Sequence, residues 1–164
     1  MIAFHAFVGS VALVTGFFIV VLKQGTSLHK ILGKVYVPAI YVLCFSSFFI
    51  FELFGRYGVF HIFSMVSVGA VTAGVVPLLR RKKGWYKQHL ENMLWSYFGL
   101  VLATCSHLFG SVFVFFKSQE FSTLATWIFT AAIVWGIPHL VGIPLIVRKV
   151  GYFKPKPAKH ATQG

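Results

Sequence analysis

Long apolar stretches separated by short polar connectors dominate the hydrophobic pattern of this chain. A helix needs about 20 mostly apolar residues to cross the hydrocarbon core of a bilayer. Five stretches reach that length: Ile2–Leu22, Val35–Phe54, Val59–Leu79, Asn92–Phe116 and Ser122–Val147. Because the connectors are short, consecutive helices should lie antiparallel. The pattern predicts an all-α integral membrane protein, an antiparallel bundle of five transmembrane helices.

The composition supports a membrane protein and excludes a soluble one. Of the 164 residues, 57% are hydrophobic and only 11% are charged, whereas soluble domains carry about 25% charged residues. A water-soluble globule of this composition would expose large apolar patches. The net charge of +12 does not indicate a nucleic-acid partner, because no soluble basic domain is left outside the apolar stretches.

The basic residues gather in alternate connectors and so set the expected orientation. Most of them lie on one side of the predicted bundle: Lys23, Lys30, Lys34, Arg80, Arg81, Lys82, Lys83, Lys87, Arg148, Lys149, Lys154, Lys156 and Lys159. Arg56 and Lys117 lie on the other side. Since positive residues stay on the cytoplasmic face, we expect the amino terminus outside and the carboxyl terminus inside, in a bacterial inner membrane. Residues 1–150 then form the transmembrane domain, and residues 151–164 form a basic cytoplasmic tail.

Histidines mark the starts of four successive predicted helices. These are His5, His29, His61 and His89. The first two stand in His-x-x-x-Gly sequences and the other two in His-x-x-x-Met sequences, which indicates a repeated helix pair. Because successive helices run in opposite directions, the first and third histidines are expected at the outer level and the second and fourth at the inner level. Ionisable residues at membrane depth are costly, and by default they indicate a functional site.

Two further histidines extend these levels. His107 follows His89 by about five turns of helix, or about 27 Å, so both share one helix face and His107 reaches the outer level. His139 lies toward the inner side of the fifth span. Each level would then hold three histidines.

Paired imidazoles at two levels are the arrangement that holds haem iron from both sides. Imidazole binds a metal in its neutral form, and the positive end of a helix dipole disfavours the charged form. We expect His5 to pair with His61 and His29 with His89, leaving His107 and His139 as second-choice ligands or hydrogen-bond partners. The arrangement resembles cytochrome b561-type di-haem bundles, in which alternate helices share a haem. This resemblance implies one or two b-type haems and electron transfer across the membrane.

Three short motifs carry a second resemblance. They are His5 with Gly9, Ala12, Leu13 and Gly16, then His29-Lys30-Ile-Leu-Gly33-Lys34-Val-Tyr36, then His89-Leu-Glu-Asn-Met93-Leu-Trp-Ser96-Tyr97. The motifs resemble those of an uncharacterised bacterial family of predicted membrane proteins, known only as a domain of unknown function. Lysine stands twice where that family has arginine, which keeps the charge and loses the bidentate geometry. The resemblance implies a multi-pass membrane protein and little about its activity.

Other interpretations of the histidines stay open. Three histidines at one level could hold zinc or copper, with Glu91 beside His89 as a general base, although so few carboxylates argue against catalysis. We predict no catalytic residue, and whether the chain is an enzyme stays open. It could also be a cofactor-free accessory or scaffold subunit of a larger membrane complex. Besides the lipid bilayer, other membrane redox subunits, a quinone or a second copy of the chain are candidate partners.

Two features of the spans have both structural and functional explanations. The small residues that follow His5 on its helix allow close helix packing, and they equally leave room for a flat cofactor. Pro138 lacks an amide hydrogen and should kink the fifth span beside His139.

Overall fold

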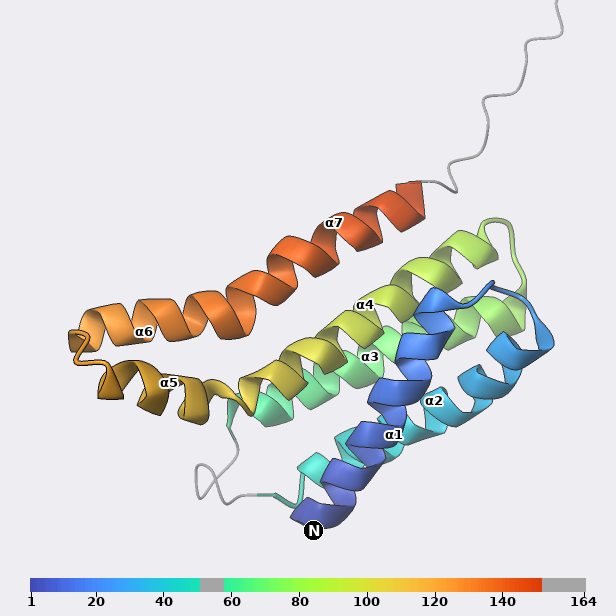
Figure 1. The fold of residues 1–164 in the computed structure, drawn as a ribbon. Coiled ribbons are helices and arrows are strands. Elements are labelled where there is room, and N and C mark those ends of the chain that lie inside the picture. Colours follow the sequence, from blue (N-terminus) through green and yellow to red (C-terminus); the bar gives the residue numbers. More distant parts are fainter. Residues whose placement is uncertain (51–57, 152–164) are drawn as a thin grey trace, which may run out of the picture.

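The structure, a computed structural model, describes residues 1–50 and 58–151, and this part contains helices and no strand. The elements are α1 (Ile2–Val21), α2 (Ser27–Ser47), α3 (Val59–Arg80), α4 (Trp85–Ser106), α5 (Phe109–Ser118), α6 (Thr123–Ala131), η1 (Ala132–Gly136) and α7 (Ile137–Gly151). Figure 1 shows them in order along the chain. Among the described residues, four continuous helices are long and apolar enough to cross a membrane, and the number is five if the bent pair of α4 and α5 is counted as one span. The predicted all-α membrane bundle is confirmed.

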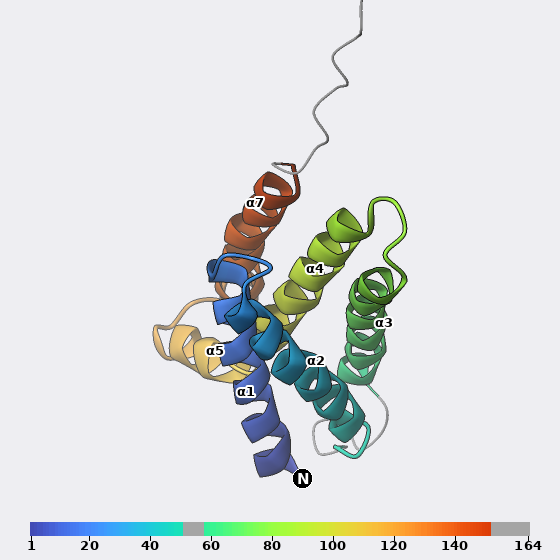
Figure 2. The ribbon, with the colours of Figure 1, turned by 90° about the vertical axis from the view of Figure 1, so that its right-hand side faces the viewer.

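The helices α1 to α4 form the centre of the bundle. The most extensive helix contacts join α3 with α4 and α1 with α2. All four helices supply buried side chains to one apolar cluster, which includes Ala12, Tyr36, Ile40, Val71 and Leu100. The last helix, α7, packs on the outside of α4, where Ile146 is buried against Leu90, Leu94 and Phe98. Figure 2 shows α7 standing beside this four-helix core.

Helices α2 and α4 begin earlier than the apolar runs that predicted them. The Oγ1 of Thr26 accepts a hydrogen bond from the backbone N–H of His29 at 3.3 Å, so it caps the first turn of α2. Gly84 adopts a left-handed φ of 82° directly before α4. Both starts bring polar residues into helix, which places His29 in the first turn of α2 and His89 in the second turn of α4.

The fourth crossing is broken where the sequence predicted a continuous span. Helices α4 and α5 are bent by 42° relative to each other. At the break, the N–H groups of His107 and Leu108 donate to carbonyls only three residues back, which ends the α-helical pattern. The hydroxyls of Thr104 and Ser106 also donate to carbonyls four residues back, an arrangement that often bends helices. The break places His107 at the end of α4.

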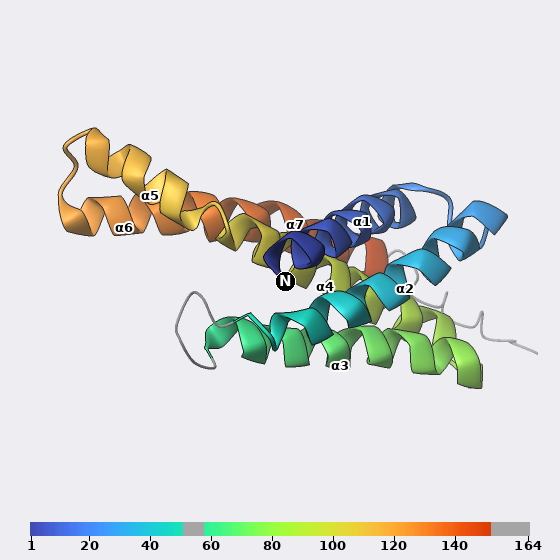
Figure 3. The ribbon, with the colours of Figure 1, turned by 90° about the horizontal axis from the view of Figure 1, so that it is seen from below.

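The fifth crossing continues through a π-helical turn, η1, between α6 and α7. There the N–H of Ile137 donates to the carbonyl of Ala132, five residues back. This irregular turn lies directly before Pro138, the residue expected to disturb the helix. Figure 3 shows that α5 and α6 form a hairpin that extends past the four-helix core. The indole Nε1 of Trp135 donates to the Oγ of Ser106 at 2.9 Å and ties η1 to the end of α4.

Most of the described basic residues lie in or near connectors at one end of the bundle, and Lys117, in the last turn of α5, is the exception among them. Figure 1 shows the α1–α2 connector, the α3–α4 connector and the end of α7 together, with the amino terminus at the opposite end. The predicted tail beyond Gly151, the end of the second predicted span and Arg56 lie outside the described residues.

Candidate functional site

His29 and His89 come together at the basic end of the bundle. The His89 Nδ1 lies 2.8 Å from the carbonyl oxygen of Gly74 on α3. A carbonyl can only accept, so the His89 Nδ1 carries the hydrogen and Nε2 keeps its lone pair. The His29 ring on α2 interacts electrostatically with His89. Its own Nδ1 is buried and makes no hydrogen bond within the described part of the chain.

Lys149 of α7 reaches the same region. Its Nζ donates to the backbone carbonyl of Val20, near the end of α1, and it also interacts electrostatically with His29. A lysine that bonds the last carbonyls of a helix stabilises that helix end. The His29–His89 pair therefore lies where α1, α2, α4 and α7 converge.

His5 lies at the other end of the bundle, and its hydrogen bonding also fixes a tautomer. The His5 Nδ1 is 2.8 Å from the Oγ of Ser46 on α2, and that hydroxyl donates its own hydrogen to the carbonyl of Leu43. The hydroxyl must therefore accept from the His5 Nδ1, which leaves the lone pair on Nε2. His5 also interacts electrostatically with His107.

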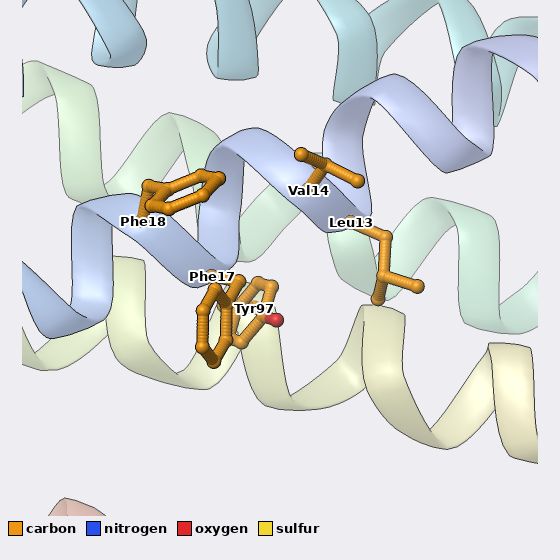
Figure 4. Close-up of a pocket in the computed structure, with 5 residues that line it drawn as sticks. All are labelled: Leu13, Val14, Phe17, Phe18 and Tyr97. Atoms are coloured by element: carbon orange, nitrogen blue, oxygen red, sulfur yellow. The ribbon is translucent and has the colours of Figure 1, made fainter.

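A pocket of about 210 Å³ lies between α1 and α4 beside His5 and His107. Among the described residues, its lining does not include His61, the partner that the sequence suggested for His5. A larger, shallower groove of about 420 Å³ adjoins it and shares Leu13 with it. Figure 4 shows the side chains of this groove, in which Phe17 of α1 lies near Tyr97 of α4.

His61 has a different hydrogen-bonding role. Its ring Nδ1 accepts a hydrogen bond from the backbone N–H of Gly58 at 3.0 Å. The backbone N–H of His61 donates to the Gly58 carbonyl. These two bonds cap the start of α3, and the ring also packs against Phe48. A neutral His61 therefore carries its hydrogen on Nε2, the opposite tautomer from His5 and His89. This arrangement favours a structural role and argues against ligation by His61.

His107 and His139 contact aromatic rings. The His107 ring stacks on Phe60 at a centroid distance of 6.2 Å. The His139 Nδ1 donates to the Trp135 carbonyl at 2.7 Å, and the ring meets the edge of Phe98. The exposed His139 side chain lies on the surface of α7.

The described residues hold no group of three or more His, Cys or Glu side chains that could bind a metal ion. One alternative from the sequence was a zinc site formed by three histidines at one level, with Glu91 as a general base. Residues 1–50 and 58–151 therefore give that site no support. What the structure brings together instead are two histidine pairs, one at each end of the bundle.

The small residues of α1 serve close packing. A Cβ on Gly16 would lie 2.4 Å from the Tyr97 ring and 2.9 Å from the Tyr36 ring, so only glycine fits there. The Tyr36 hydroxyl in turn bonds the Oγ of Ser96 at 3.1 Å. This part of the α1–α4 contact is filled by tyrosine rings and leaves no space for a flat cofactor.

Several residues at these sites were not predicted from the sequence. Ser46 fixes the His5 tautomer, Lys149 interacts with His29, and Ser10 and Thr104 line the pocket. None stands in a motif, because each acquires its role through contacts between helices. The stripe of small residues after His5 was the one signal that pointed to this helix face.

Comparison with known proteins identifies a family and no characterised relative. Residues 2–141 match the model of the family described as "Predicted membrane protein (DUF2306)". Neither the curated proteins nor the solved structures gave a match, so the resemblance to cytochrome b561-type bundles stays a prediction. The match covers most of the chain and confirms the family resemblance carried by the three histidine motifs. The chain belongs to the DUF2306 family of predicted membrane proteins.

Proposed function

We propose that this chain is a membrane electron-transfer protein that binds a b-type haem between His29 and His89. The observation that carries the proposal is the hydrogen bonding of the ring nitrogens of His29 and His89. His89 has a lone pair on Nε2 because Nδ1 donates to Gly74, and the neighbouring His29 has a buried Nδ1 with no hydrogen-bond partner in the described residues. A buried polar atom without a partner is costly, and coordination of iron would remove that cost.

The residues around the pair suit such a ligand. Ligating histidines almost always donate their second ring nitrogen to a carbonyl, carboxylate or water, as His89 does to Gly74. Side chains of α4 next to it, including Leu90 and Leu94, are buried and apolar. Lys149 adds a positive charge that could pair with a haem propionate. When bound, the haem would supply reversible one-electron chemistry.

The second haem expected from the sequence stays a prediction. If it is present, His5 and His107 are the favoured ligands, because they line one pocket and interact electrostatically, whereas the His61 Nδ1 accepts from the Gly58 N–H. Electrons would be exchanged with other membrane redox subunits or with a quinone. Ligation of zinc or copper, and a cofactor-free accessory or scaffold role, are the alternatives that the following experiment separates.

The test is the absorbance spectrum of the full-length chain purified in detergent, oxidised and then reduced with dithionite. We expect a Soret band and sharpened α-bands on reduction, with at least one haem per chain. His29→Ala and His89→Ala should each remove the same spectral component. His139→Ala is the matched control, because His139 also lies in a span and also donates from Nδ1 to a carbonyl, and it should leave that component unchanged.

Folding of each variant is checked by its elution as a single species in size-exclusion chromatography. A His89→Gly variant that regains the band when free imidazole is added would show that the lost group was a ligand. A folded, colourless wild-type chain, with or without bound zinc or copper, would overturn the proposal. So would a spectrum that survives both alanine substitutions.

A further inference from the structure

The pocket between α1 and α4 differs chemically from the His29–His89 pair. Its lining residues from α1 are His5, Ala6, Gly9, Ser10 and Leu13, and those from α2 and α4 are Leu43, Leu100, Ala103, Thr104 and His107. We propose that this pocket binds the ring of a lipid-soluble quinol, an aromatic ring with two hydroxyl groups and an apolar tail. Binding itself goes beyond the proposed function. The use of the quinol as an electron source rests on that function.

The polar groups of the pocket are mainly hydrogen-bond acceptors. Ser10 donates its hydroxyl hydrogen to the carbonyl of Ala6 at 2.9 Å, and Thr104 donates to the carbonyl of Leu100 at 2.9 Å. Both oxygens therefore have only lone pairs left for a ligand. His5 offers the lone pair of Nε2, because Nδ1 is bound to Ser46. Groups of this kind select a ligand that donates, and a hydroxyl on an aromatic ring is a good donor.

The same chemistry argues against the commonest alternative occupant, the headgroup of a phospholipid. A phosphate only accepts hydrogen bonds at neutral pH, so it prefers a site rich in N–H donors and cations. Lys and Arg are absent from the described lining of the pocket. Among the described lining residues, the His107 ring can supply a donor, which suits the oxygen of a single hydroxyl.

The size of the pocket suits one ring. Its volume of about 210 Å³ lies below the roughly 300 Å³ at which pockets for drug-sized ligands begin. Small side chains at Ala6, Gly9 and Ala103 form part of its wall, and the buried Leu43 and Leu100 supply an apolar surface for a ring face. A haem macrocycle would require α1 and α4 to move apart, whereas a substituted benzene ring would not.

The adjoining groove supplies a place for the apolar tail. It is lined by Leu13, Val14, Phe17, Phe18 and Tyr97, and it meets the pocket at Leu13. The exposed fractions of Val14, Phe17 and Phe18 lie between 45% and 55%, so the groove opens on the side of the helices that faces lipid. Figure 4 shows these side chains along α1. A polar ring site that continues into an apolar groove matches an amphiphile that arrives from the bilayer.

The test is calorimetric titration of the detergent-solubilised full-length chain, under argon, with a benzoquinol that carries a ten-carbon tail. The paired probe is the dimethyl ether of the same compound, which has the same ring and tail but no hydroxyl donors. We expect the quinol to bind at least ten-fold more tightly than the ether. Ala103→Phe, which fills the pocket, and His107→Phe, which removes a polar partner from its exposed rim, should each weaken quinol binding at least ten-fold. Val114→Phe, a change at an exposed α5 position away from the pocket, should leave binding within two-fold.

Equal binding of the quinol and its ether would indicate simple partitioning into the apolar phase and would overturn the inference. Wild-type affinity for the quinol in both pocket variants would also overturn it. Two haems per chain, one of them lost in His107→Phe, would assign the pocket to a haem and also overturn it. The haem spectrum of the same preparation separates the two proposals. If a colourless chain binds the quinol through the pocket, this inference holds and the proposed function is overturned. If a haem-loaded chain fails to bind the quinol, the proposed function holds and this inference is overturned.

Discussion

At the scale of single residues, hydrogen bonds decide which histidines are ready to act as ligands. His5 and His89 each donate from Nδ1 and keep a lone pair on Nε2, whereas the Nδ1 of His61 accepts from the Gly58 amide. The sequence predicted which histidines begin helices, because apolar runs and their polar flanks are local. It could not predict the tautomers of His5 and His89, because Ser46 and Gly74 reach these two rings only through the packing of other helices.

Gly16 is one of the glycines where packing leaves no room for a side chain. We expect Gly16→Ala to destabilise the bundle by about 1–3 kcal/mol, because its Cβ would overlap the Tyr97 and Tyr36 rings. Gly33→Ala is the control, since no atom lies within 4 Å of a Cβ at that position, and alanine favours a helix more than glycine does. Unfolding by sodium dodecyl sulfate in mixed micelles, followed by far-ultraviolet circular dichroism, measures both. Equal effects of the two substitutions would contradict the close approach of α1 to the tyrosine rings.

At the scale of helices, the sequence predicted the positions of the apolar helical segments better than it predicted whether each helix is continuous. All five apolar runs correspond to helical segments, yet the fourth is broken at His107 and the fifth contains a π-helical turn. Neither proline nor glycine marks the first break, because Leu102–Phe109 contains neither residue. Pro138 did indicate a disturbance in the fifth crossing. The form of that disturbance depends on contacts of η1 with α4, which no local pattern contains.

The hydrogen bond from Trp135 to Ser106 links these two irregular segments. A double-mutant cycle with Ser106→Ala and Trp135→Phe should give a coupling free energy of about 1 kcal/mol, the usual net value of such a bond. The same cycle with Ser106→Ala and Trp127→Phe serves as the control. Trp127 packs on Phe109 and Phe113 in the α5–α6 hairpin, and we expect no coupling there. A coupling of similar size in both cycles would mean that general packing, and not this bond, joins the segments.

At the scale of the whole molecule, the two ends of the described chain lie at opposite ends of the bundle. The basic connectors gather at the end where α7 finishes, while Lys117 lies in the last turn of α5. The sequence predicted this separation of charge directly, because each described basic residue lies in a connector or near a helix end, and each connector lies on one side. Which side faces the cytoplasm remains an expectation from the positive charge alone.

Reporter fusions in a bacterial host test that orientation. Green fluorescent protein fused after Gly164 should fluoresce, because it folds in the cytoplasm, and alkaline phosphatase fused there should be inactive. Alkaline phosphatase inserted after Glu120, in the turn between α5 and α6, should be active, because that turn is expected outside. The reverse pattern at both positions would mean that the bundle is inserted with its basic end outward.

The turn between α3 and α4 also sets how deeply the bundle sits in the bilayer. Arg81 adopts a left-handed φ of 48° and lies over the Trp85 ring at 5.4 Å, and Tyr86 follows directly. Tryptophan and tyrosine settle at the level of the lipid headgroups, and His89 comes about one helical turn, or about 6 Å, below Trp85. The His29–His89 pair would therefore lie just under the aqueous boundary on the basic side. Under the proposed function, a haem held there would lie close to water on that side, and electrons would reach it without crossing the hydrocarbon.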